Sequence, residues 1–143
     1  MASTLRPILL IAADWRARAL ALAELQEAGY EVEAAPGVRD AARALLSGSV
    51  EPGLLLLDTR DDADATPEKA VGLLELAPQA PAIVITGAYE QATWEPLRPR
   101  LAALLHRPIS IAKVVEAVQR VLPAPTERGS MTGRDGLERG AGG

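Results

Sequence analysis

One carboxylate stands at the end of a run that is apolar at every position. Asp58 directly follows residues 54–57, which are all leucine. A strand that is apolar on both faces is typical of the centre of a parallel sheet covered by helices on both sides. The carboxyl end of such a strand opens into the crevice where α/β sheets bind their ligands. Asp58 is therefore a candidate ion-pair partner, metal ligand or nucleophile toward phosphorus.

A second group of carboxylates follows Asp58 in the chain. The spacing of Asp62, Asp64 and Thr66 begins like a calcium-binding loop of the EF-hand type. However, Pro67 stands where that loop requires glycine, and Leu73 stands where it requires a bidentate acid. The pattern fails, and we expect a solvated acidic loop.

Other catalytic patterns are weak. The only histidine, His106, has no partner spacing for a metal site or a triad, and we expect it at the end of a strand. Residues 12–16 (AADWR) lack the glycine pattern of a nucleotide-binding turn. No Gly-x-Ser-x-Gly elbow occurs, so a hydrolase of that type is not indicated.

The composition is that of one globular domain. The chain has 143 residues, of which 48% are hydrophobic and 24% are charged. The net charge of -4 argues against nucleic acid as a direct partner, and the lack of cysteine excludes disulfide and thiol chemistry. No apolar run approaches membrane-spanning length, and the first six residues do not resemble a signal peptide. We expect a cytoplasmic protein that is not bound to membranes.

Strand and helix patterns alternate along the chain. The apolar runs predict strands at residues 8–11, 30–34, 54–57, 82–85 and 101–105. Helices are expected after the capping residues Asp14, Thr66 and Ser110, and after the Pro36–Gly37 turn. Five such units predict an α/β fold with a doubly wound parallel sheet and helices on both faces. The first helix has a predicted inward stripe of Ala17, Leu20, Ala21, Leu25 and Ala28, and Gly29 closes it.

The composition changes near the end of the chain. Residues 123–143 are rich in glycine, and Met131 and Leu137 are their only sizeable apolar residues. Such a segment buries too little surface to order itself. We therefore predict a single domain at 1–122 and a disordered tail at 123–143.

In their order and spacing, several of these segments together resemble the receiver domain of bacterial response regulators, of the kind found in chemotaxis regulators. They are residues 8–11, 27–32, 54–58, 83–87 and 107–110, and the resemblance covers about residues 6–122. It implies a flavodoxin-like five-stranded sheet in the order 2-1-3-4-5. It also implies that Asp58 is the phosphate-accepting residue and that Thr86 supplies the hydroxyl that closes on the phosphoryl group.

The chain departs from this family where the family holds Mg²⁺. Receivers carry two adjacent acids after the first strand, and here those positions are Ala12 and Ala13. A methyl group offers no ligand to a hard cation, so no metal is expected unless phosphorylation nevertheless occurs. Asp14 comes one residue later, and we expect it to cap the following helix.

A second departure is Arg107, which replaces the lysine that the family places before a proline. The guanidinium is a planar fork suited to gripping a carboxylate. One hypothesis is that Arg107 pairs with unmodified Asp58 and locks one conformation. The alternative is that Arg107 points into solvent while water or backbone holds Asp58.

The signalling surface also departs from the family. Leu104 stands at the position of the aromatic switch residue and has no ring to move. Pro96 and Pro99 interrupt the segment of the fourth helix, so a regular helix cannot run through it. Trp94 lies beside them and is a candidate interaction surface, although a tryptophan packed over a helix end is equally common.

These features favour a non-enzymatic signalling module. The leading interpretation is an atypical single-domain receiver that acts through protein–protein contacts without normal Mg²⁺-dependent phosphorylation. The alternative is a working phosphoacceptor that takes phosphate on Asp58 from a histidine kinase. A third interpretation is a flavodoxin-like binder of a small ligand in the same crevice. Expected partners are other signalling proteins, such as a kinase or an output protein, and a homodimer is a further option.

Overall fold

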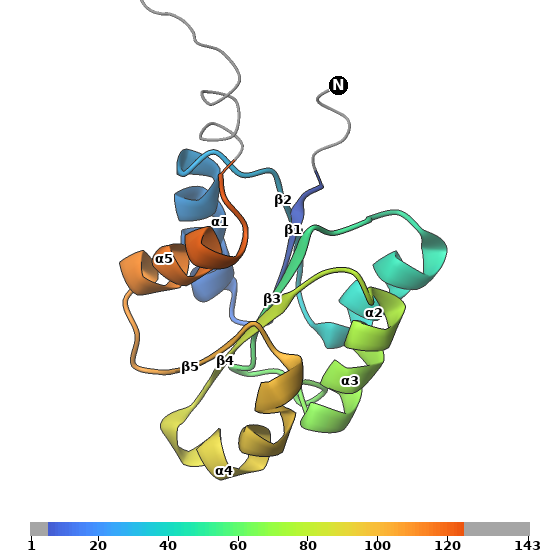
Figure 1. Ribbon diagram of the computed structural model, residues 1–143, viewed down its shortest axis with the longest axis vertical. Coiled ribbons are helices and arrows are strands. Elements are labelled where there is room, and N and C mark those ends of the chain that lie inside the picture. The colour runs from blue at the N-terminus through green and yellow to red at the C-terminus, as the bar shows by residue number, and fades with distance from the viewer. Residues whose placement is uncertain (1–5, 125–143) are drawn as a thin grey trace, which may run out of the picture.

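A computed structural model describes residues 6–124 of the chain. The predicted tail lies outside the described residues from position 125 onward. The elements alternate as expected, with two 3₁₀ segments around a short fourth helix (Figure 1). In chain order they are β1 (Ile8–Ala12), α1 (Trp15–Glu27), β2 (Val32–Ala35), α2 (Val38–Ser47), β3 (Leu54–Asp58), α3 (Pro67–Leu76), β4 (Ala82–Thr86), η2 (Ala88–Glu90), α4 (Gln91–Trp94), η3 (Glu95–Arg100), β5 (Ala103–His106) and α5 (Ile111–Val121).

The five strands form one parallel sheet in the order β2-β1-β3-β4-β5. The predicted flavodoxin-like architecture and strand order are thus confirmed. Strand β3 lies at the centre, and its register places Asp58 opposite Ala12 of β1 and Ile85 of β4. The candidate site therefore lies at the carboxyl edge of the sheet, as the sequence predicts.

Two apolar layers cover the sheet. Helices α1 and α5 lie on one face, and α2 and α3 lie on the other (Figure 1). Residues of β3 alternate between the layers, with Leu54 and Leu56 in the first and Leu55 and Leu57 in the second. Because both faces of the strand are buried, each of these positions carries an apolar side chain, which here is always leucine.

The predicted stripe of α1 is wrong at one position. Ala21 and Leu25 are buried as expected, but Leu20 is 51% exposed. Leu20 lies on the side of α1 that faces a pocket toward the start of α5, and the sheet does not cover it there. At the end of the helix, Gly29 has a φ of 101°, a left-handed conformation that glycine adopts without strain.

The edges of the other elements differ slightly from the predictions. Strand β2 begins two residues late because Tyr30 is buried in the α1/α5 layer and donates a hydrogen bond to the Leu122 carbonyl. Strand β5 likewise begins at Ala103 rather than at position 101. Ala124 is also buried in the α1/α5 layer, so packing continues past the predicted domain boundary at Leu122.

The segment between β4 and β5 is irregular, as its prolines predict. Helix α4 spans only four residues, and the chain continues as a 3₁₀ segment through Pro96 and Pro99. Of the two options that the sequence left open for Trp94, an exposed contact residue and a packed tryptophan, the structure has the packed one. Trp94 is 2% exposed and belongs to the same apolar cluster as Leu97 and Leu104. The indole at the end of α4 therefore belongs to the same apolar layer as residues of α2 and α3.

Candidate functional site

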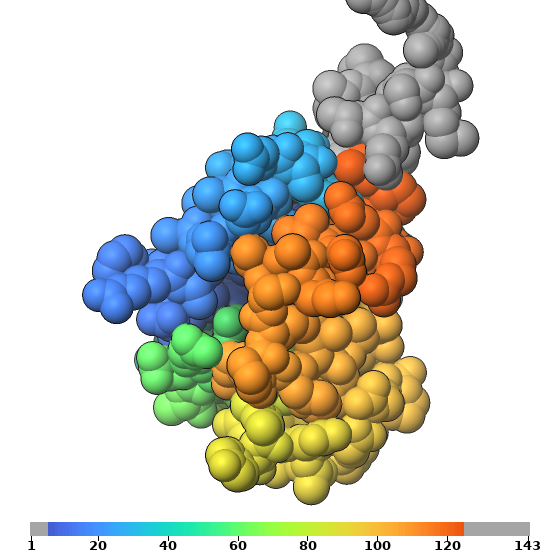
Figure 2. All heavy atoms as spheres, turned by 90° about the vertical axis from the view of Figure 1, so that its left-hand side faces the viewer, coloured from blue at the N-terminus to red at the C-terminus, as the bar shows by residue number. Residues whose placement is uncertain are grey.

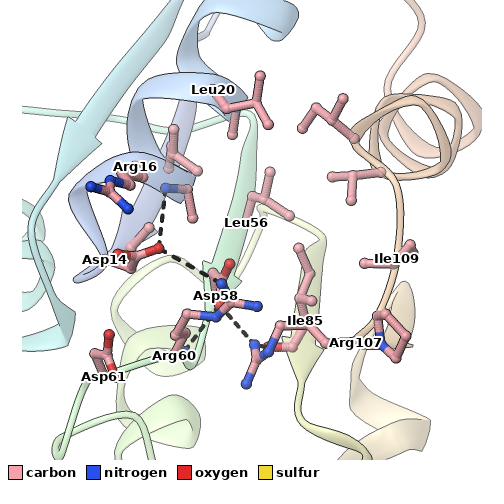
Figure 3. A pocket seen from close by; sticks show the side chains of 17 residues that line it. Asp14, Arg16, Leu20, Leu56, Asp58, Arg60, Asp61, Ile85, Arg107 and Ile109 are labelled. Carbon is pink, nitrogen blue, oxygen red and sulfur yellow. Dashed lines mark hydrogen bonds and ion pairs between the residues drawn. The ribbon is translucent and has the colours of Figure 1, made fainter.

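Asp58 and Arg107 form an ion pair at the carboxyl edge of the sheet. Arg107 follows β5, and its Nη1 donates to Asp58 Oδ1 at 2.8 Å and to the Ile85 carbonyl at 3.1 Å (Figure 3). The Asp58 and Arg107 side chains are only 14% and 17% exposed. The pairing that the sequence left open is therefore present. A pair shielded to this degree interacts more strongly than one on the surface.

The chain after β3 adds a second donor to the same oxygen. The backbone N–H of Arg60 donates to Asp58 Oδ1 at 3.0 Å, which holds the carboxylate in a local turn. In the described part of the chain, both hydrogen bonds to this carboxylate end on Oδ1. Asp58 Oδ2 is left as the atom with which an incoming group would react.

Arginines surround the positions that would carry the metal-binding acids. Arg18 Nη1 donates to the carbonyls of Ala12 at 2.7 Å and Ala13 at 3.4 Å. Asp14 caps α1, as predicted, by accepting from the backbone of Ala17 at 3.3 Å. The Asp14 carboxylate also lies 3.8 Å from Arg60 Nη1.

These residues do not fit Mg²⁺. The two alanine side chains carry no oxygen ligand, and Asp14 and Asp58 are both engaged by arginines. Within residues 6–124, no three acidic or histidine side chains converge in a way that could hold a metal ion.

Thr86 is directed away from Asp58. The side chain is fully buried, and its Oγ1 lies 3.0 Å from His106 Nδ1. Thr86 and His106 are register partners at the ends of β4 and β5. His106 does end a strand, as expected, but sequence reasoning missed its contact with Thr86. Among the described residues, His106 Nε2 is the buried side-chain atom that has no hydrogen-bond partner.

A second network, which the sequence did not reveal, ties Arg107 to the segment after β4. Arg107 Nη2 lies 3.3 Å from Thr59 Oγ1, and the Thr59 hydroxyl donates to Glu90 Oε1 at 3.2 Å. The same Glu90 oxygen accepts from the backbone of Gly87 at 3.1 Å. Glu90 therefore links the ends of β3 and β4 to the arginine that holds Asp58.

The acidic loop has a structural role rather than being merely solvated. Gly37 precedes α2 and offers no capping side chain, and Asp62 takes over this function from the loop after β3. Its carboxylate accepts from the backbone N–H of Val38 at 2.9 Å and from that of Asp64 at 3.0 Å. The loop is thereby fixed to the start of a helix that lies far away in the sequence.

Replacing Asp62 with alanine should lower the free energy of unfolding by about 1 kcal/mol, the usual cost of a lost helix cap. Urea denaturation would measure the change. Asp61→Asn is the matched control, because this exposed neighbour has a φ of 60° that asparagine also tolerates. An equal loss in both variants would show that the loop, and not the cap, sets the effect.

The shifted pKa values belong to exposed pairs outside the site. A hydrogen bond from Lys69, together with its charge, lowers the pKa of Asp64 below its ordinary value. Arg98 lowers the pKa of Glu95 in the same way, and Glu95 raises the pKa of Arg98. These two pairs stabilise the fold while their carboxylates are ionised, and this contribution is lost as the pH falls through the lowered pKa.

A pocket of about 580 Å³ opens beside Asp58. The view in Figure 2 looks toward the opening of this pocket. Helix α1, in blue, lies on one side of the opening, and the segment leading into α5, in orange, lies on the other. The pocket combines charged residues from the ends of the strands with apolar residues from α1 and α5. Among its lining residues are Ala12, Asp14, Leu20, Asp58, Arg60, Arg107, Ile109 and Ile111.

Comparison with known proteins supports the fold. No family model matches the chain, and no curated protein matches it in sequence. Solved structures do match. A response regulator receiver domain protein from Clostridium thermocellum has a TM-score of 0.70 at 15% identity, over 90% of this chain and 99% of that one. A response regulator receiver protein from Sinorhizobium medicae has a TM-score of 0.67 at 25% identity, over 84% of this chain and 96% of that one.

A third structure extends the comparison to a chemotaxis protein. CheY4 of Vibrio cholerae has a TM-score of 0.66 at 19% identity, over 82% of this chain and 99% of that one. Together with the strand order, these matches establish that the chain has the fold of response-regulator receiver domains.

None of the helices within residues 6–124 reaches both the length and the hydropathy that a membrane span needs.

Proposed function

We propose that the chain is an atypical receiver in two-component-type signal transduction, which acts by binding other proteins without ordinary Mg²⁺-dependent phosphorylation. One observation carries the proposal. Arg107 holds Asp58 at 2.8 Å, while Ala12 and Ala13 occupy the positions of the metal-binding acids.

The chemistry of phosphoryl transfer explains why this arrangement opposes the reaction. Negative charge on the transferring group must be neutralised, and in receivers a metal ion contributes much of that neutralisation. Here no carboxylate pair is present to bring a metal. Arg107 Nη1 already donates to Asp58 Oδ1 and to the Ile85 carbonyl, so this cation is not free to neutralise the charge on a group that reacts at Asp58 Oδ2.

The partners are proposed to be other signalling proteins, such as an output protein or a histidine kinase, in the cytoplasm. A second copy of the chain is a further candidate. Because Trp94 is buried, it does not supply the contact surface. Tyr89 is fully exposed on η2, directly before the residue Glu90 that is linked to Arg107 through Thr59. A partner that contacts Tyr89 would therefore bind next to the network that holds Asp58.

The second candidate function is a working phosphoacceptor. It is favoured by Asp58 Oδ2, which accepts none of the described hydrogen bonds and belongs to a residue that lines the pocket. A kinase that supplied its own cationic groups would replace some of the missing charge. Under this alternative the domain relays phosphate as an ordinary receiver does.

Intact mass after incubation with acetyl phosphate and Mg²⁺ separates the two functions. We expect no phosphoryl adduct on the natural chain. The variant Ala12→Asp/Ala13→Asp/Arg107→Lys restores the metal-binding acids and the lysine, and it should be modified at least about 100-fold faster in a Mg²⁺-dependent manner. Adding Asp58→Asn to that variant should abolish the adduct. A natural chain that is labelled, and that loses the label with Asp58→Asn, would establish the phosphoacceptor instead.

A further inference from the structure

The pocket beside Asp58 has a charged end and an apolar end. Asp14, Arg60 and Arg107 belong to the charged end, and Leu20 and Ile109 belong to the apolar end, where α1 faces the segment before α5 (Figure 3). Its volume of about 580 Å³ is in the range of pockets that enclose small organic molecules. Such molecules bind mainly through apolar contact, and a few polar groups fix their orientation.

The part of the pocket beside Asp58 does not carry the unpaired carboxylates that would bind a hydrated metal ion. Ala12 lines it with a methyl group, and the charge of Asp58 is balanced by Arg107 at 2.8 Å. An organic group that binds there would displace water from apolar surface, and the Asp58–Arg107 ion pair could stay intact. Ala12 therefore offers no ligand to a metal ion, and its methyl group leaves apolar surface against which an organic molecule can pack.

Leu20 supplies an uncovered apolar wall. It is 51% exposed, although Ala21 and Leu25 of the same helix are buried. Ile109 and Ile111 line the opposite side of the pocket from the chain that enters α5. A ring or branched chain between these walls would bury Leu20 and contact both isoleucines, which is favourable in proportion to the apolar area removed from water.

Arg60 supplies an anion-binding group at the charged end. Its Nη1 lies 3.8 Å from Asp14 Oδ2, and its side chain is 49% exposed. This pair is much longer and more solvated than the Asp58–Arg107 pair, so it is easier to rearrange. Arg16 also lines the pocket, with its guanidinium 5.3 Å from the ring centre of Trp15. A planar acid group can accept two parallel hydrogen bonds from a guanidinium.

We propose that this pocket binds a small organic anion, with an aromatic or branched apolar body between Leu20 and the two isoleucines and with its acid group on Arg60. This inference goes beyond the proposed docking function, because it gives the domain a chemical input that requires neither phosphate nor metal. It also stands if Asp58 proves to be a phosphoacceptor.

Anilinonaphthalene sulfonate is a suitable probe, because it joins an aromatic body to one acid group. We expect saturable one-to-one binding with a Kd on the order of 10 μM, followed by dye fluorescence and by quenching of the exposed Trp15. Leu20→Glu should weaken binding by about tenfold or more, and Arg60→Gln by about fivefold. Leu46→Glu is the matched control: Leu46 is a 71% exposed leucine on α2 and should change the Kd by less than about twofold.

The uncharged analogue N-phenylnaphthylamine tests the acid group separately, and it should bind the natural chain at least about tenfold more weakly. Circular dichroism would confirm that each variant is folded. Binding that fails to saturate, equal effects of Leu20→Glu and Leu46→Glu, an unchanged Kd in Arg60→Gln, or equal binding of the uncharged dye would each overturn the proposal. None of these outcomes depends on whether Asp58 accepts phosphate, which the mass measurement decides independently.

Discussion

Replacing Arg107 with alanine is expected to lower the free energy of unfolding by about 3 kcal/mol. The substitution leaves Asp58, which is 14% exposed, without the guanidinium that balances its charge. It also removes the hydrogen bonds from Arg107 to the Ile85 carbonyl and to Thr59 Oγ1, although the Ile85 carbonyl still accepts from the backbone N–H of Thr59. Urea denaturation followed by far-ultraviolet circular dichroism would measure the loss.

Arg98→Ala is the matched control for this prediction. Arg98 also pairs with a carboxylate, at 2.7 Å from Glu95, but the two side chains are 48% and 43% exposed. The loss there should be far smaller than in Arg107→Ala, as for most surface pairs. Adding Asp58→Asn to Arg107→Ala should recover part of the stability, because the uncompensated charge is removed. Equal losses in the two alanine variants would show that Asp58 is not held by a shielded pair.

The stability of this pair bears directly on signalling. Phosphorylation would convert the Asp58 carboxylate into an acyl phosphate and so replace its present pair with Arg107, which is also joined through Thr59 to Glu90. Releasing the arginine would therefore disturb the start of the segment that carries Tyr89. In the unmodified chain this network holds Asp58, Arg107 and Glu90 in one conformation. A docking surface around Glu90 would then be present at all times, as the proposed function requires.

The fold could be predicted from the sequence because its signals are local. The leucine run of β3 requires burial on both faces, and Asp14, Thr66 and Ser110 each cap a helix through their own side chains. These preferences act within a few residues and do not depend on distant contacts. The boundary of β2 was misplaced because the position of Tyr30 is set by α5, which lies far along the chain.

The site could be predicted only in part. Its centre, Asp58, follows from the strand that ends there, but the direction of a long side chain such as Arg107 depends on tertiary contacts, so the sequence left two options. The pairing of Thr86 with His106 could have been found from the strand order, because both residues end neighbouring parallel strands. The role of Glu90 could not, because it depends on the 3₁₀ turn that brings this residue back to Gly87.

The expected burial of Leu20 is wrong, and the sequence left the exposure of Trp94 open, for the same reason. Periodicity gives the face of a helix but does not show what lies opposite that face. Leu20 is on a regular helix yet borders an open pocket, whereas Trp94 is in an irregular segment yet covers the sheet. Proline predicts correctly that a helix is interrupted, but it does not predict where the neighbouring side chains then point.

Replacing Trp94 with alanine should lower the free energy of unfolding by about 3–5 kcal/mol, the cost of removing a large buried aromatic side chain. Trp94 is 2% exposed, and its segment contains only one short turn of α-helix between two 3₁₀ segments. Such a segment has few internal hydrogen bonds, so the buried indole must supply much of its stability. Trp15→Ala is the matched control, because Trp15 is 63% exposed and its loss should cost less than about 0.5 kcal/mol.

The same variant tests how the segment between β4 and β5 is held. Trp94 shares its apolar cluster with Leu97 of η3 and with Leu104 of β5. If the indole anchors this segment, Trp94→Ala should also raise amide hydrogen exchange across residues 88–100 more than across α1 or α5. A small and uniform change would instead show that the indole does not anchor the segment. In that case the surface around Tyr89 would keep its shape without the buried tryptophan, and Glu90 and Arg107 would be the contacts that hold it.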